Sequence, residues 1–310
     1  MNIPHVWQRG AFLAISTFLC VIWINELQLI ESADFFTKLV SRSIPLMLVA
    51  LAAGVIISSG KLDLSIGALV GLLGSLLVSR PELFEGNIII ALVLAFVTAL
   101  LGCTIAALGV AGLRLNALIV TLGLAYIYRG LSLYVQVTTG NGGGFKEMFP
   151  FTSEVFQFGT IVGVVGFLWF WRYQSRWGLR HISLGLDEHS ARLAGIQPRR
   201  VLFLAFVIVS FLAALYPFFF MAIISNGSFS SAHGWGVELA AITAAVIGGC
   251  RLSGGTFDPI PIAMAALLIR SLEMLVIKIA DKQEYAQIAW GALLILAIIF
   301  DSYENRRRAN

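Results

Sequence analysis

Charged residues are scarce in this chain. Of its 310 residues, only 12% are Asp, Glu, Lys or Arg, whereas 58% are hydrophobic, and the mean hydropathy is +0.88. A soluble globule of this length needs more polar surface than this composition supplies, which excludes a soluble protein. The composition is typical of a polytopic membrane protein.

The residue patterns of hydrolytic and redox enzymes are also missing. No Gly-rich turn is followed by Lys-Ser or Lys-Thr, so the chain lacks a P-loop and cannot bind and hydrolyse ATP by itself. Three cysteines and four histidines occur without metal-ligand spacing: Cys20, Cys103, Cys250, His5, His181, His189 and His233. We expect buried cysteines and solvated surface histidines. No catalytic residue, metal site or cofactor site is predicted, and the chain is not expected to be an enzyme.

Apolar runs of about the length that crosses a hydrocarbon core recur along the whole chain, and only helices or closed barrels satisfy the backbone there. Because the runs are far too long for barrel strands, we predict an all-α fold of about ten transmembrane helices in one domain, residues 1–310. The predicted spans are residues 10–30, 44–59, 64–79, 88–110, 116–136, 155–172, 201–224, 237–250, 260–279 and 286–301. The first is interpreted as a retained helix, since no small-residue cleavage site follows it.

Basic residues are distributed unevenly between the two sides of this arrangement. With a cytosolic N-terminus, the inside segments hold 13 of the 21 Lys and Arg residues and the outside segments hold 6. The positive-inside rule therefore places both termini in the cytosol. The net charge of +4 has this topological explanation, so membrane lipid is an expected partner and nucleic acid is not.

Two predicted helices are interrupted by polar and glycine residues. Apolar character runs from Leu46 to Ile57, stops at Ser58–Asp63 and resumes at Leu64, which predicts a broken or re-entrant pair of half-helices. A Gly-rich interruption at Gly248–Gly255 falls on the same side. Broken helices are tolerated only where protein or a watery cavity covers the freed backbone, so both breaks are expected to point into the bundle centre.

Two charged residues in or beside the predicted spans have competing interpretations. Asp63 is expected to cap the following helix, and a direct role in transport is the alternative. Arg129 lies among aromatic residues in the outer half of its span. It either extends to the membrane interface or contacts an extracytoplasmic partner or a polar solute.

The longest polar stretch is Arg172–Arg200, which holds six arginines together with Asp187 and Glu188. Within it, Leu184–Ile196 predicts a short amphipathic helix that is capped near Asp187 and ends at Gly195. The helix either lies flat on the cytosolic membrane surface or docks into the groove of a partner protein. Small residues that would permit close approach are Ser190, Ala191, Ala194 and Gly195.

Four motifs in order resemble the permease subunits of ATP-binding-cassette importers for monosaccharides, the family of the ribose, galactose, arabinose, xylose and autoinducer-2 systems. Ser59–Gly67 (SGKLDLSIG) resembles the family's GGIDLSVG, and Asn116–Gly123 followed by Tyr128–Gly130 resembles its PFIATLG and YRG pair. Gly185–Ile196 resembles the cytosolic coupling segment, and Gly248–Gly255 (GGCRLSGG) resembles a GGTxLxGG signature. The resemblance covers most of the chain.

The chain departs from the family pattern at several positions. Lys61 stands where an apolar residue or Gly is usual, and Asp187 stands where Asn is common. Pro259, Pro261 and Ala263 follow the last motif in place of further glycines. One hypothesis is that the chain pairs with a different permease rather than with a copy of itself, and the sequence leaves both arrangements open.

The resemblance implies a multi-pass protein of the bacterial inner membrane. This chain would form half of the pathway for a sugar or similar small neutral polar solute, next to a second permease. Separate cytosolic ATPase subunits would use ATP and Mg, and an extracytoplasmic solute-binding protein would deliver the solute. The coupling segment would cover about residues 173–200, with ATPase contacts at Gly185, Asp187, Glu188, Ala191, Arg192, Leu193, Gly195 and Ile196.

The broken helices and the fifth predicted span would line or gate the solute path. The expected residues are Asp63, Ser65, Gly67, Asn116, Thr121, Tyr126, Arg129, Gly248, Gly249, Ser253, Gly254 and Gly255. The alternative function is an ion-coupled secondary transporter, which also uses broken helices. Such a transporter needs buried carboxylates, and we identify only Asp63 and Glu273 as candidates. An intramembrane enzyme is a third alternative, disfavoured because no nucleophile is paired with a base.

Overall fold

The computed structural model describes residues 35–79, 87–139, 150–224 and 228–280, with isolated positions between 285 and 299. Helices and turns account for these residues, and no strand occurs among them. The all-α prediction is thus confirmed for the described chain. The predicted span at residues 10–30 lies outside the described residues, as does most of the span at 286–301 and both termini.

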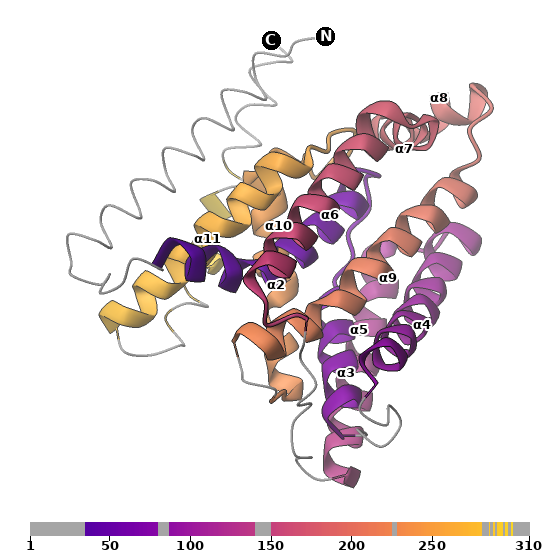
Figure 1. Ribbon diagram of the computed structural model, residues 1–310. Helices are drawn as coiled ribbons and strands as arrows, with labels where there is room; N and C mark the ends of the chain where they lie inside the picture. Colours follow the sequence, from indigo (N-terminus) through magenta and orange to yellow (C-terminus); the bar gives the residue numbers. More distant parts are fainter. Residues whose placement is uncertain are drawn as a thin grey trace.

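The helices follow in the order α2, α3, α4, η2, α5, α6, α7, α8, α9, η3, α10 and α11 (Figure 1). Their bounds are Phe35–Ile57, Ile66–Ser79, Ile88–Ala107, Leu108–Gly112, Ala117–Thr139, Glu154–Gln174, Arg176–Leu186, Glu188–Leu193, Pro198–Ile223, Ser231–Gly234, Val237–Ile247 and Pro259–Ala280. Among these residues, six helical segments are long and apolar enough to cross a membrane: Thr37–Ile57, Ile88–Gly112, Ala117–Thr138, Glu154–Gln174, Pro198–Ile223 and Pro259–Ile277. Each matches a predicted span, whereas two further predicted spans correspond to the short helices α3 and α10.

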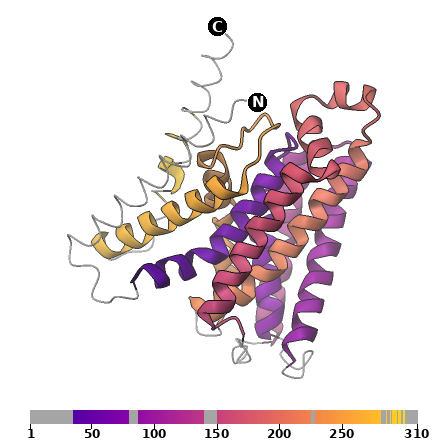
Figure 2. The ribbon, with the colours of Figure 1, turned by 45° about the horizontal axis from the view of Figure 1, so that its top comes forward.

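The helical chain is interrupted at three places that bear on the predicted site. The first is one that we predicted, where α2 ends at Ile57 and α3 begins at Ile66. The second lies between α9 and α10, where η3 precedes Gly236, which has φ +79° and forms the N-cap of α10. The segment Gly248–Gly255, which we predicted as the second interruption, is also non-helical. That segment connects α10 to α11 and packs against the chain just after α2 at the end of the bundle that carries α7 and α8 (Figures 1 and 2).

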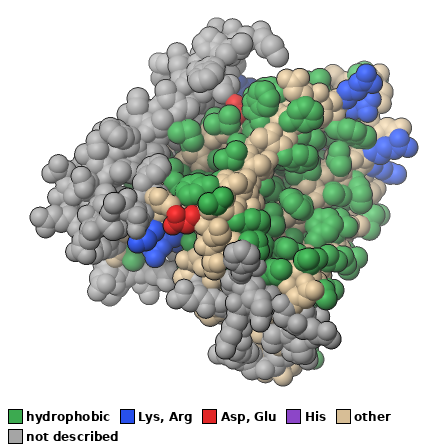
Figure 3. All heavy atoms as spheres, in the orientation of Figure 1, with side chains coloured by type: hydrophobic (Ala, Val, Ile, Leu, Met, Phe, Trp, Pro, Cys, Tyr) green, Lys and Arg blue, Asp and Glu red, His purple; other side chains and the backbone are tan. Residues whose placement is uncertain are grey.

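Helix α2 forms the centre of the fold. It packs against α9, α10 and α11, with α11 on one side and α3, α4 and α5 on the other (Figure 1). Of the most apolar part of α2, 83% is buried, against 28% for each of α4, α5 and α6. Apolar side chains accordingly cover much of the face shown in Figure 3, and Lys and Arg side chains stand at the end where α8 lies. The exposed faces of α4 to α6 are therefore suited to contact lipid or another subunit.

Small residues line the buried face of α4, whose main neighbour is α9. They are Ala91, Ala95, Ala99, Gly102, Cys103, Ala106 and Ala107. Lipid tails are as apolar as side chains, so helices in a membrane associate through close packing rather than through the hydrophobic effect. A stripe of small residues permits that close approach between α4 and α9.

A larger side chain on this stripe is expected to destabilise the fold. Ala99 is fully buried, so Ala99→Leu should force α4 away from its neighbours and cost about 1–3 kcal/mol. Thermal unfolding in detergent should show a lower midpoint for this variant. Val97→Leu, on the exposed side of the same helix, is the matched control and should leave the midpoint unchanged. An equal loss for both variants would contradict tight α4–α9 packing.

Candidate functional site

Glycines join three chain segments at the end of the bundle that carries α7 and α8. The Gly255 N–H donates to the Ser58 carbonyl oxygen at 2.8 Å, which links the α10–α11 connection to the end of α2. A Cβ on Gly185 would overlap that same carbonyl oxygen, and a Cβ on Gly254 would meet the backbone of Gly60 and Gly185. Only glycine allows backbones to approach this closely. We call this contact of residues 58–60, 185 and 254–255 the glycine junction.

His181 fastens α7 to the end of α2 beside the glycine junction. Its side chain is fully buried, with Nε2 donating to the Val55 carbonyl oxygen at 2.8 Å and lying 2.9 Å from Ser58 Oγ. Burial lowers the pKa of His181 to about 4, so the ring is neutral at pH 7. Our expectation of solvated histidines is therefore wrong for His181, because α7 packs onto the bundle. It is also wrong for half-buried His233, which packs on Phe220, whereas exposed His189 confirms it.

Helix α8 confirms the predicted short helix. The Asp187 carboxylate caps it by accepting bonds from the backbone N–H groups of His189 and Ser190. A hydrogen bond from the Ser190 hydroxyl is the largest influence that lowers the pKa of Asp187. Gly195, with φ +80°, follows the helix and ends it as predicted. A separate helix, α7, precedes it and was not predicted.

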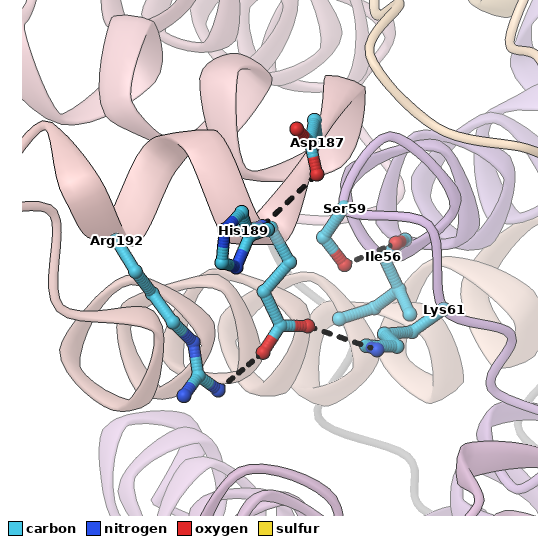
Figure 4. Close-up of polar contacts among 7 residues, drawn as sticks. Ile56, Ser59, Lys61, Asp187, His189 and Arg192 are labelled. Atoms are coloured by element: carbon cyan, nitrogen blue, oxygen red, sulfur yellow. Dashed lines mark hydrogen bonds and ion pairs between the residues drawn. The ribbon is translucent and has the colours of Figure 1, made fainter.

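Glu188 connects α8 to the break between α2 and α3. Its two carboxylate oxygens accept bonds from Arg192 at 2.5 Å and from Lys61 at 3.4 Å (Figure 4). The Arg192 hydrogen bond is the main cause of the lowered pKa of Glu188. Lys61 is one of the departures from the family pattern, and here it ties the chain after α2 to the predicted coupling segment.

Polar side chains satisfy the backbone where α2 and α3 are interrupted. Asp63 is buried, and its Oδ1 accepts bonds from the Ser65 N–H at 2.8 Å and the Ser65 hydroxyl at 2.6 Å. The Leu64 N–H donates to Thr121 Oγ1 on α5 at 3.1 Å. We predicted Asp63 as the N-cap of the following helix, but α3 begins at Ile66, so Asp63 lies two residues before the N-cap position and closes the turn that precedes it.

An ion pair between a half-buried arginine and a buried glutamate lies between α5 and the first turn of α10. Arg129 donates to Glu238 Oε1 at 2.5 Å, and the ring of Trp235 lies 5.9 Å from the guanidinium carbon. Glu238 is 7% exposed, and its second oxygen, Oε2, is buried without a hydrogen-bond partner among the described residues. A Cβ on Gly67 would overlap Oε2, so the missing side chain of Gly67 makes room for the carboxylate.

Glu238 is a site residue that the sequence analysis missed. It falls at the second position of a predicted span, yet only Asp63 and Glu273 were considered as membrane carboxylates. A lone Glu just after the Gly234-Trp235-Gly236 sequence was the available signal, because glycines mark chain breaks and acidic residues favour the first turn of a helix. Glu273 instead pairs with Arg270 within α11 at 2.8 Å.

The predicted pathway residues divide into two groups in the structure. Asp63, Ser65, Gly67, Thr121 and Arg129 lie together around the start of α3 and the middle of α5. Ser253, Gly254 and Gly255 form the second group at the glycine junction, where the Ser253 carbonyl oxygen approaches Gly60. Gly248 instead packs against Ile262 of α11, and the Gly249 carbonyl oxygen accepts a bond from the Thr256 hydroxyl.

The remaining two predicted pathway residues lie elsewhere on α5. Asn116 caps the start of α5 by accepting a bond from the Leu118 N–H at 2.9 Å. Tyr126 is exposed on the outer face of α5. The described residues contain no group of three or more His, Cys, Asp or Glu side chains that could hold a metal ion.

Membrane helices with interruptions between them and a short polar helix at one end are typical of a membrane transport subunit. A family model for the branched-chain amino acid transport system / permease component matches residues 35–298, and the chain belongs to this family. Its similarity extends to the Autoinducer 2 import system permease protein LsrD of Photorhabdus luminescens, 27% identical over 81% of this chain and 78% of the relative. The LsrD proteins of Escherichia coli K12 and Shigella flexneri are each 26% identical over 99% of this chain and 96% of their own length.

These similarities confirm the resemblance to permeases of monosaccharide-type ATP-binding-cassette importers. The chain is accordingly a membrane transport component of that family. No solved structure matches this chain.

The buried His181 predicts that stability depends on pH. Because its folded pKa of about 4 lies below the ordinary value of 6.5, the unfolded chain binds the proton first as the pH falls. The stabilisation is complete above pH 6.5 and is lost toward pH 4, by roughly 3 kcal/mol in total. Thermal unfolding of the wild type in detergent should show this decline, and His181→Gln should flatten it. His189→Gln, at an exposed position of α8, should retain the wild-type profile; a flattened profile there as well would contradict the assignment to His181.

Proposed function

We propose that this chain forms one half of the translocation pathway of an importer for a sugar or a similar small neutral polar solute. The relatives are named for import of autoinducer 2, and a solute of that kind is our candidate for this chain. Few ionisable groups lie within the described spans, which favours a neutral solute over an ion. The second half would be another permease, either a copy of this chain or a different one, in the bacterial inner membrane.

The observation that carries this proposal is the continuous connection between α8 and the Arg129–Glu238 ion pair. Glu188 on α8 binds Lys61, and the glycine junction holds α7 against Ser58. The interrupted chain then leads through Asp63 to α3, where Gly67 adjoins Glu238. A displacement of α7 and α8 would therefore reach the Arg129–Glu238 pair through this chain of backbone and side-chain contacts.

We place α7 and α8 in the cytosol, against separate ATPase subunits that use ATP and Mg. Basic residues gather at this end of the described chain, in agreement with the positive-inside rule. They are Lys61, Arg114, Arg176, Arg180, Arg192, Arg199, Arg200 and Arg251. ATP-driven closure of the ATPases would shift the coupling segment, about residues 173–200, and change which side of the bundle is open. An extracytoplasmic solute-binding protein would supply the solute from the other side.

Glu238 is the one observation that favours the alternative, an ion-coupled secondary transporter. A buried carboxylate could carry a proton or sodium ion. In this structure, however, Glu238 already faces the Arg129 guanidinium, which neutralises its charge. We therefore assign the pair to gating or solute contact rather than to ion coupling.

Reversal of the Arg192 charge tests the coupling segment. Arg192→Glu would place two carboxylates one helical turn apart on α8 and remove the hydrogen bond to Glu188. In proteoliposomes that contain the co-purified ATPase, we expect ATP hydrolysis to continue while solute uptake falls at least tenfold. Arg192→Lys retains the charge and should retain most uptake. Normal coupled uptake by Arg192→Glu would remove the support for this segment as the coupling element.

Neutralisation of the Arg129–Glu238 pair tests the pathway. Glu238→Gln leaves the half-buried Arg129 without its partner, which should cost less than the ~3–5 kcal/mol typical of a fully buried pair, and it should reduce uptake strongly. The double variant Arg129→Gln/Glu238→Gln removes both charges and should recover stability without recovering uptake. Unfolding in detergent and uptake in proteoliposomes separate the two effects. Full uptake by the stable double variant would mean that the pair serves the fold alone.

A further inference from the structure

A groove of about 470 Å³ opens beside α8, at the same end of the bundle as the glycine junction. The α2–α3 break, the turn between η2 and α5, α8 and the start of α9 each contribute to its wall. Its charged lining residues are Lys61, Arg114, Glu188, Arg192 and Arg199. Four cationic side chains thus face one carboxylate, and the groove is strongly electropositive.

The single carboxylate is already used by two of these cations. Glu188 accepts bonds from Lys61 and Arg192, whereas Arg199 donates to the Gly112 carbonyl oxygen at 3.4 Å and forms no ion pair within the described part of the chain. Arg114 is exposed and has no ion-pair partner among the described residues. The positive charge of Arg114 and Arg199 is therefore available to an anionic ligand.

The backbone at Arg114 is held in an unfavourable conformation. Its φ of +57° is the only positive φ among the described non-glycine residues. The left-handed region is unfavourable for residues with a Cβ, and such strain is concentrated at functional sites. The π-helix η2 lies directly before this turn, and π-helical turns are also frequent at functional sites. Arg114 is thus fixed at the groove at a cost to stability, which a role in ligand binding would explain.

Exposed leucines lie next to the basic groove. Leu113 and Leu193 are 72% and 78% exposed, and Leu115 is also exposed. The apolar outer face of α5 continues from this turn with Leu118 and Ile119. A free phosphate in water would gain nothing from these side chains, whereas the acyl chains of a lipid would cover them. The combination of fixed positive charge and apolar rim therefore favours a phospholipid over a soluble anion.

We propose that this groove binds the phosphoryl headgroup of an anionic phospholipid, with Arg114 and Arg199 as its anchors and the acyl chains along the start of α5. The volume is sufficient for a glycerophosphate headgroup. Because the groove is bounded by α8 on one side and by the η2–α5 turn on the other, the lipid would join these two elements. The site requires only that this end of the bundle lies at a membrane surface, so it does not depend on which solute the permease carries.

Native mass spectrometry of the detergent-purified chain, titrated with phosphatidylglycerol and with zwitterionic phosphatidylcholine, tests the site. We expect the wild type to prefer phosphatidylglycerol, and Arg114→Gln and Arg199→Gln each to weaken that lipid about fivefold, since a basic residue near an anionic membrane contributes about 1 kcal/mol. Arg200→Gln is the matched control, because Arg200 is the adjacent arginine and does not line the groove. It should bind as the wild type does.

The variant Arg114→Gly distinguishes a specific loss of lipid binding from a loss of folding. Glycine adopts φ +57° without strain, so this variant should unfold at the same or a higher temperature while it loses the preference for phosphatidylglycerol. Loss of lipid binding in a protein that remains folded supports the site.

Three outcomes would overturn the proposal. Equal weakening by Arg114→Gln and Arg200→Gln would indicate diffuse surface charge. Displacement of the lipid by inorganic phosphate at equal concentration would indicate a site for a soluble anion. Unchanged lipid binding with loss of the co-purifying ATPase in Arg114→Gln would indicate that an acidic protein segment occupies the groove.

Discussion

The structure depends on one constraint: a polypeptide that leaves helical geometry inside a membrane bundle must find protein partners for its backbone. The chain does so between α2 and α3, and each partner comes from a different element. Gly255 binds the Ser58 carbonyl, His181 binds the Val55 carbonyl, and Thr121 binds the Leu64 N–H. The same bonds that satisfy the break therefore attach α5, α7 and the α10–α11 connection to α2. The break is the structural centre of the fold because so many elements must meet there to make it possible.

Local signals predicted the parts of the fold and site that local chemistry determines. The lengths of the apolar runs predicted the six long helices, and the polar residues after Ile57 predicted the first break. Asp187 and Gly195 predicted the two ends of α8. Depth within the bundle is different, because it is fixed by packing between distant segments. The sequence placed Gly248–Gly255 on the same side as the first break, but it could not show that the two segments touch each other and α7 in the glycine junction.

Buried polar residues were the least predictable features, for the same reason. Nothing near His181 in the sequence reveals that α7 folds back onto α2, so its burial was not foreseen. Glu238 was overlooked because α10 begins inside the bundle at a glycine turn. The other residues of the predicted span 237–250 are mostly apolar, so the single carboxylate did not change the assignment of the span. By contrast, two of the departures from the family pattern have clear roles: Asp187 caps α8, and Lys61 links that helix to the break.

The glycine junction has a mechanical consequence. Side chains that transmit a movement between two helices can change rotamer, and the rotamer change absorbs part of the movement. At Gly185, Gly254 and Gly60 the backbones touch directly and no rotamer is available to yield. No side chain at the junction can rearrange to accommodate a movement. Even a sub-ångström shift of α7 must therefore displace the backbone of the residues that follow α2.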